Sequence, residues 1–85
     1  LHNDIKRTIK ECKNWDWFDR QPDRVKRVLV ELVYNIGYPS ASNFNLMLSA
    51  LAQDDLATAS SELLDSKYAR QVPFRAQRLS DRLRG

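Results

Sequence analysis

The chain has 85 residues and a mass of 9.9 kDa, which is the size of one small domain. Its two glycines, Gly37 and Gly85, are too few for the tight turns of a β-rich fold or for a glycine-rich phosphate loop. One cysteine, Cys12, and one histidine, His2, exclude an internal disulfide and a His/Cys metal cluster. No apolar run reaches the length of a membrane span. The composition therefore predicts an all-α fold without cofactor or metal.

The net charge is +3, but it is unevenly distributed. Residues 66–85 contain six basic residues and one acidic residue, whereas residues 1–65 contain eight basic and ten acidic residues. A basic end of this kind can bind an anionic partner, such as nucleic acid, a membrane surface or a cell-wall polymer. The alternative is a solvated helix face with no partner.

The first predicted helix spans residues 1–12, with a narrow apolar stripe made by Leu1, Ile5, Ile9 and Cys12. Its other face is charged, so the helix alone is marginal, and we expect it to pack along a neighbour or to bridge two lobes. The chain starts without Met and already in a helical pattern, which suggests a piece of a longer protein or a processed product.

Three aromatic residues follow within four positions, in Trp15-Asp16-Trp17-Phe18. They cannot all face one side of a helix, so we expect a short helix or turn that packs the end of the bundle. The alternative is a stacking platform for sugars or bases.

The strongest periodicity predicts a buried central helix over residues 22–36. Pro22 suits its first turn, and Gly37 followed by Pro39 marks its end. The apolar positions fall on one face: Val25, Val28, Leu29, Leu32, Val33 and Ile36.

Four shorter helices are predicted after Pro39, at about 43–52, 55–64, 67–70 and from Pro73 onward. Ser40 and Ser42, then Asp54 or Asp55, and then Ser66 are the candidate caps. Inward positions are expected at Phe44, Met47, Leu48, Leu51, Leu56, Ala59, Leu63, Leu64, Ala76, Leu79 and Leu83. The prediction is a single lobe over residues 1–85, a compact bundle of about seven short helices with a helical core at 22–83.

No catalytic constellation stands out. Glycoside hydrolysis needs a carboxylic acid of raised pKa and a second carboxylate across a cleft, and the acidic residues here are better explained as caps and loop groups. From the residues alone, the chain is a helical module with a basic C-terminal helix.

One long stretch resembles a known family. The residues that carry it are Tyr34-Asn35-Ile36-Gly37, then Phe44, Leu48 and Leu51, then Ala59 and Leu63, and finally the segment 66–78, Ser-Lys-Tyr-Ala-Arg-Gln-Val-Pro-Phe-Arg-Ala-Gln-Arg. Together they resemble the C-terminal lobe of the phage-type lysozymes of the T-even phage branch. Residues 1–12 resemble the helix that joins the two lobes of that family.

The resemblance implies a muramidase, which hydrolyses the β-1,4 bond between N-acetylmuramic acid and N-acetylglucosamine in peptidoglycan. The catalytic glutamate of the family lies in an N-terminal lobe that has no counterpart here, so no catalytic residue is expected in this chain, and the chain alone is expected to be inactive. The resemblance places Tyr34, Met47 and Glu62 at the substrate and Arg75 beside the missing glutamate. The alternatives are rim packing for Tyr34, core packing for Met47, and solvated surface positions for Glu62 and Arg75.

The implied partners are peptidoglycan glycan strands and the missing catalytic lobe. The implied location is synthesis in the bacterial host cytoplasm and action on the wall, in the periplasm or from a phage particle. The alternative function is a stand-alone basic module that binds wall polymer or nucleic acid through Arg75, Arg78 and Arg82, with nucleic acid the less expected partner.

Overall fold

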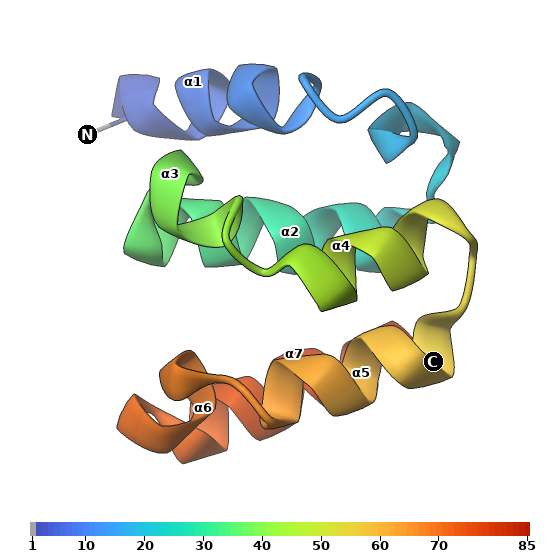
Figure 1. Cartoon of the computed structure of the whole chain (residues 1–85). Helices are drawn as coiled ribbons and strands as arrows, with labels where there is room; N and C mark the ends of the chain where they lie inside the picture. Colours follow the sequence, from blue (N-terminus) through green and yellow to red (C-terminus); the bar gives the residue numbers. More distant parts are fainter. Residues whose placement is uncertain (1) are drawn as a thin grey trace. The chain divides into compact units, whose positions relative to one another are not determined.

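The computed structural model describes the backbone of residues 2–85 and the side chains from residue 5 onward (Figure 1). The described residues form helices and no strand, so the all-α prediction is confirmed, as is the number of about seven helices. The elements are α1 (His2–Cys12), the 3-10 turn η1 (Phe18–Arg20), α2 (Asp23–Ile36), α3 (Tyr38–Ala41), α4 (Asn45–Ala52), α5 (Leu56–Leu64), α6 (Lys67–Gln71) and α7 (Pro73–Arg84). None of these helices is long and apolar enough to cross a membrane.

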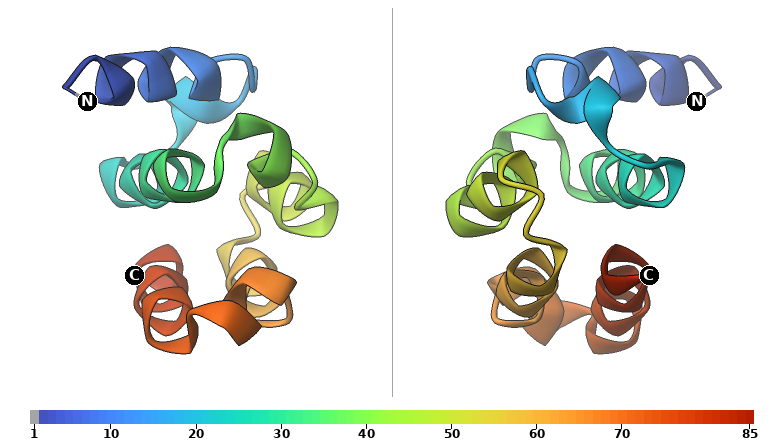
Figure 2. Two further views of the ribbon diagram at one scale, coloured as in Figure 1. Left: turned by 90° about the vertical axis from the view of Figure 1, so that its left-hand side faces the viewer. Right: turned by 90° about the vertical axis from the view of Figure 1, so that its right-hand side faces the viewer.

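The chain divides into two compact units, residues 1–43 and residues 44–85. In the first unit α2 packs against both α1 and α3. Figures 1 and 2 show that α1 and α2 run side by side in opposite directions. In the second unit α5 packs on both α4 and α7, and α6 packs on α7. The single lobe predicted over the whole chain stays a prediction.

The predicted helix over 22–36 is present as α2, and the residues predicted to face inward are buried. Ile36 at the end of the helix is only half-buried. The other predicted inward residues are at most 2 % exposed: Val25, Val28, Leu29, Leu32 and Val33. The helix stops at Gly37, whose φ of 86° lies in the left-handed region that glycine adopts without strain. The Gly37 N–H donates to the Val33 carbonyl at 2.7 Å and closes the last turn.

α1 follows the predicted range, but its predicted stripe is buried only in part. Cys12 is 0 % exposed, as expected, whereas Ile5 and Ile9 are 51 % and 37 % exposed. Thr8, which was not part of the predicted stripe, is 5 % exposed. Leu1, the first residue of the predicted stripe, lies outside the described residues. The prediction that this helix packs along a neighbour is confirmed, because α1 contacts α2.

The segment after Gly37 differs from the prediction. Pro39 was expected to mark only the end of the preceding helix, but it lies in the first turn of α3, where its missing N–H is not needed. Ser40 and Ser42 are not N-caps of the next helix; Phe44 takes that position in α4 and makes no side-chain cap bond. Among the other inward predictions, Leu64 is wrong, since it is 36 % exposed.

Two short polar side chains fix the boundaries of α5 and α6 as predicted. The Asp55 carboxylate accepts from the Thr58 N–H at 3.2 Å, and hydrogen bonds from the Thr58 hydroxyl and from this N–H lower the pKa of Asp55. The Ser66 hydroxyl accepts from the Ala69 N–H at 3.2 Å. α7 begins at Pro73. Its N-cap residue is Val72, whose apolar side chain cannot accept a hydrogen bond from the first turn of the helix.

α5 and α7 meet through two buried serines, Ser60 and Ser80. Their hydroxyl groups are hydrogen-bonded to each other, and the Ser60 hydroxyl also donates to the Ser80 carbonyl at 3.1 Å. Arg84 Nε donates to the hydroxyl oxygen of Ser60 at 2.9 Å. These bonds satisfy the hydroxyls inside an interface that is otherwise apolar.

Candidate functional site

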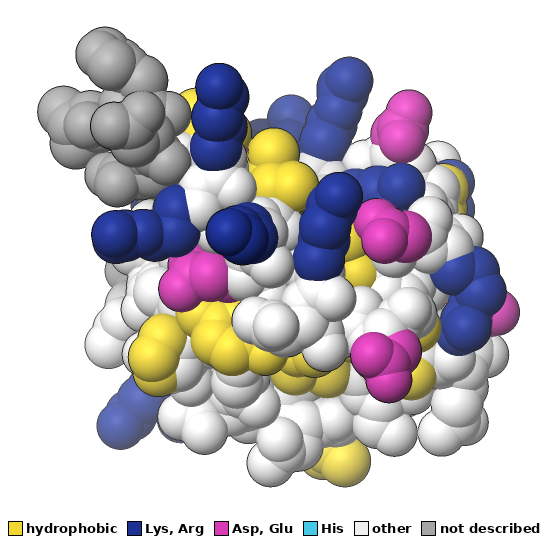
Figure 3. Space-filling model, turned by 90° about the horizontal axis from the view of Figure 1, so that it is seen from above, with side chains coloured by type: hydrophobic (Ala, Val, Ile, Leu, Met, Phe, Trp, Pro, Cys, Tyr) yellow, Lys and Arg dark blue, Asp and Glu magenta, His cyan; other side chains and the backbone are white. Residues whose placement is uncertain are grey.

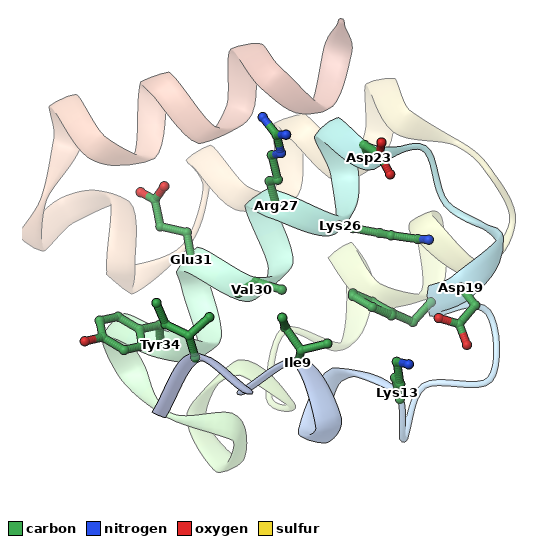
Figure 4. A pocket seen from close by; sticks show the side chains of 11 residues that line it. Ile9, Lys13, Asp19, Asp23, Lys26, Arg27, Val30, Glu31 and Tyr34 are labelled. Atoms are coloured by element: carbon green, nitrogen blue, oxygen red, sulfur yellow. The ribbon is translucent and has the colours of Figure 1, made fainter. Parts of the chain in front are cut away.

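The first unit has an open groove of about 620 Å³ between α1, η1 and α2 (Figure 4). Its volume falls in the range of sites that hold a small ligand. All its lining residues belong to this unit: Ile5, Ile9, Lys13, Phe18, Asp19, Asp23, Lys26, Arg27, Val30, Glu31 and Tyr34. We call it the α1–α2 groove.

Two pairs of residues spaced four apart give the groove its apolar walls. Ile5 and Ile9 come from one face of α1, and Val30 and Tyr34 come from one face of α2. Ile5, Ile9 and Tyr34 are each more than a third exposed, so the described side chains of the first unit leave much of their surface uncovered. The groove is therefore an apolar surface that stays open to solvent.

Charged side chains of both signs surround this apolar surface. The basic ones are Lys13, Lys26 and Arg27, and the acidic ones are Asp19, Asp23 and Glu31. In Figure 4 Tyr34 lies at one end of the groove, while Lys13 and Asp19 lie at the other. Figure 3, viewed from the side of α1, shows Lys and Arg side chains projecting around hydrophobic atoms. Such a groove suits a ligand with an apolar face and polar edges, such as a sugar ring.

Of the sequence-predicted site residues, Tyr34 is the one that lines this groove. Its ring is 46 % exposed at the C-terminal end of α2, so a ligand in the groove can reach it.

The other three residues lie in the second unit. Met47 on α4 is 1 % exposed, so its side chain offers almost no surface to a ligand, as its alternative reading as core packing expects. Glu62 on α5 is half-buried, and Arg75 in the first turn of α7 is exposed. Arg75 lines a small cavity of about 330 Å³ with residues 71–74, and neither Met47 nor Glu62 contributes to it.

The sequence reasoning missed the exposed walls contributed by Ile5 and Ile9. Their four-residue spacing was recognised, but periodicity shows only that residues share a face and not whether a neighbour covers it. It also missed the bond between the buried serines Ser60 and Ser80 and the bond from Arg84 to Ser60, since isolated serines on two helices carry no pairing signal.

The metal-ligating residue types and the cysteine thiol are the remaining reactive groups to place. In the described part of the chain no three His, Cys, Asp or Glu side chains are placed to hold a metal ion. The Cys12 thiol is fully buried, and this burial, together with the nearby Glu11 charge, raises its pKa to about 12. It is therefore protonated at neutral pH.

Comparison with known proteins gives no relative. No protein-family model, no curated protein and no solved structure matches the chain.

Proposed function

We propose that this chain is the helical C-terminal lobe of a phage-type lysozyme and forms one wall of its peptidoglycan cleft. The proposal starts from the sequence resemblance over residues 34–78. The observation that carries it further is the position of Tyr34. This residue places an exposed aromatic ring at the end of a groove whose volume is sufficient for a sugar. A flat ring with a hydroxyl can stack on a pyranose face and bond its edge.

The exposed walls of the α1–α2 groove fit the same proposal. An isolated helical domain gains stability by covering residues such as Ile5 and Ile9, and here they stay open. In the proposed enzyme this surface faces either the glycan or the catalytic lobe. The chain supplies binding surface, and the second lobe supplies the acid that protonates the leaving oxygen.

Besides the sugar contact of Tyr34, the proposal gives Arg75 the role of pairing with a carboxylate on the catalytic lobe. It is exposed in the first turn of α7, so its guanidinium can reach a carboxylate on another lobe. A cation beside a carboxyl group favours the ionised form and fixes its orientation. The part of the proposal that concerns Met47 needs a rearrangement of α4, because the side chain is buried.

Sedimentation with purified peptidoglycan sacculi tests the binding role on the chain as it exists. We expect the chain to pellet with the sacculi, and Tyr34→Ala to weaken binding about tenfold, as the loss of about 1.4 kcal/mol does. Tyr34→Phe keeps the ring and retains binding. Leu46→Ala, which removes an exposed apolar side chain from α4, is the matched control and leaves binding unchanged. Equal binding by Tyr34→Ala and the unaltered chain contradicts the assignment of Tyr34.

A second candidate is a stand-alone basic module. It is favoured by α7, where Arg75, Arg78 and Arg82 are all exposed and share one helix face by their three- and four-residue spacing. Binding of this kind is dominated by phosphate contacts and weakens steeply with salt. A DNA mobility-shift titration at low ionic strength decides: salt-sensitive binding supports the module, and no binding at low salt rejects its nucleic-acid form.

A further inference from the structure

Six of the residues that line the α1–α2 groove come from α2 and lie along one side of this helix (Figure 4). We call them the α2 face: Asp23, Lys26, Arg27, Val30, Glu31 and Tyr34. Asp23, Arg27 and Tyr34 are exposed, and the other three are half-buried. Spacings of three and four residues keep the α2 face on one side over about three turns of helix. The face is therefore a continuous strip that a second helix can contact.

The positions of the α2 face are symmetric about the middle of the helix. They pair as 23 with 34, 26 with 31, and 27 with 30. All three pairs share one midpoint, which lies between Val28 and Leu29. A two-fold axis through this midpoint and perpendicular to α2 places α2 of a second copy antiparallel to the first. Each position of the α2 face then lies opposite its paired position on the second copy.

The charges at the paired positions are complementary. Lys26 lies opposite Glu31 of the second copy, and the symmetry makes this pair twice in one dimer. Both side chains are half-buried, so solvent ions screen their attraction less than that of a fully exposed pair. A parallel pairing in register would instead place each charge opposite its own copy. The charge pattern therefore favours the antiparallel arrangement.

The remaining two pairs also fit each other. Asp23 lies opposite Tyr34 of the second copy, where the phenol can donate a hydrogen bond to the carboxylate. Arg27 lies opposite Val30 of the second copy, whose apolar side chain can pack on the aliphatic stem of the arginine. No position of the α2 face therefore meets a like charge in this arrangement.

The charge balance of the α2 face also points to a second copy of the chain. Two acidic and two basic residues cancel, so the face has no net charge with which to attract an anionic polymer or a strongly charged helix. Each charge on the face finds its opposite on the same face of another copy. This self-complementarity is what an interface related by a two-fold axis requires.

We propose that the chain forms a symmetric homodimer through the α2 face, with the two α2 helices antiparallel. The second copy covers the groove and removes the apolar surface of Ile5, Ile9 and Tyr34 from water, which stabilises the dimer. The patch is small, so we expect a Kd in the micromolar to millimolar range. This goes beyond the proposed function and has a consequence for it: the second copy and a glycan compete for the groove.

Sedimentation equilibrium of the full chain from about 1 μM to 1 mM tests the proposal. We expect a reversible equilibrium of monomer and dimer without larger species, because a two-fold interface closes on itself. Lys26→Glu places carboxylates opposite each other and is expected to raise the Kd about tenfold or more. Glu31→Lys does the same with two ammonium groups. The double variant that carries both substitutions restores the pairing with its signs exchanged, and is expected to dimerise like the unaltered chain.

Arg24→Glu is the matched control, because Arg24 is exposed on α2 but does not line the groove. It changes the net charge as Lys26→Glu does, and it is expected to leave the Kd unchanged. Far-UV circular dichroism checks that each variant is folded. If a charge reversal unfolds the chain, an alanine double-mutant cycle of Lys26 and Glu31 replaces it, and additive effects on the Kd contradict the pairing.

Three results overturn the proposal. They are a monomer at every concentration, growth into larger oligomers, and a dimer that both charge reversals leave intact. A monomeric chain leaves the groove open to a glycan or to another protein. Sacculi binding is measured below the Kd of the dimer, so either proposal can fail alone.

Discussion

Cys12 is the residue whose chemistry its surroundings change most. Burial raises its thiol pKa from 9.0 to about 12, with Glu11 as the smaller cause, so the native thiol stays protonated where the unfolded one ionises. Below pH 9 the shift leaves the free energy of unfolding unchanged. As the pH rises from 9 toward 12, only the unfolded state loses the proton, so stability falls.

Thiol labelling tests the burial that causes this shift. An aromatic disulfide reagent needs both access to the sulfur and its thiolate form, and the native fold restricts both. At pH 8 we therefore expect the reagent to label the native chain at least on the order of 100-fold more slowly than the chain in denaturant. Equal rates in the two conditions contradict the buried position of Cys12.

At the scale of the element, most helix boundaries were predictable because single residues determine them. Gly37 ends α2 through its positive φ, and Asp55 and Ser66 begin α5 and α6 through side-chain bonds. α3 was missed because a single turn has no periodicity, and because Pro39 is compatible both with ending a helix and with starting one. The burial of side chains was less predictable than the ends of the helices, as the exposed Ile5 shows. Burial depends on which element the fold places against each face of a helix.

α7 gives the prediction at this scale. Its N-cap residue, Val72, makes no side-chain cap bond. Val72→Thr supplies a hydroxyl for the free N–H groups of the first turn and is expected to stabilise the chain by about 1 kcal/mol. For a domain of this size that raises the melting temperature by roughly 4–8 °C.

Thermal unfolding followed by circular dichroism checks this expectation. Val72→Ala is the matched control, because it also removes the branched apolar side chain but offers no cap. If the threonine variant melts no higher than the alanine variant, α7 is not limited by its N-cap.

At the scale of the whole molecule, the fold class was predictable from the sequence, whereas the site assignments stay predictions. Tyr34 lines a groove and Arg75 is exposed, so both are accessible to a ligand, but Met47 is buried. The sequence predicts packing for the aromatic residues at 15–18, but a spacing of two residues cannot show that the rings of Trp15 and Trp17 stack on each other. The open groove could not be derived at all, since it depends on the separation of two helices.

We propose that this chain works as one lobe of a two-lobed muramidase. The most direct test fuses the N-terminal lobe of a T-even phage lysozyme before Leu1 and follows lysis of purified cell walls. We expect lysis by the fusion and none by the chain alone. We also expect a loss on the order of 100-fold in Arg75→Ala, partial recovery in Arg75→Lys, and full activity in the charge-matched control Arg70→Ala. Lysis by the isolated chain, or full lysis by the Arg75→Ala fusion, contradicts this proposal.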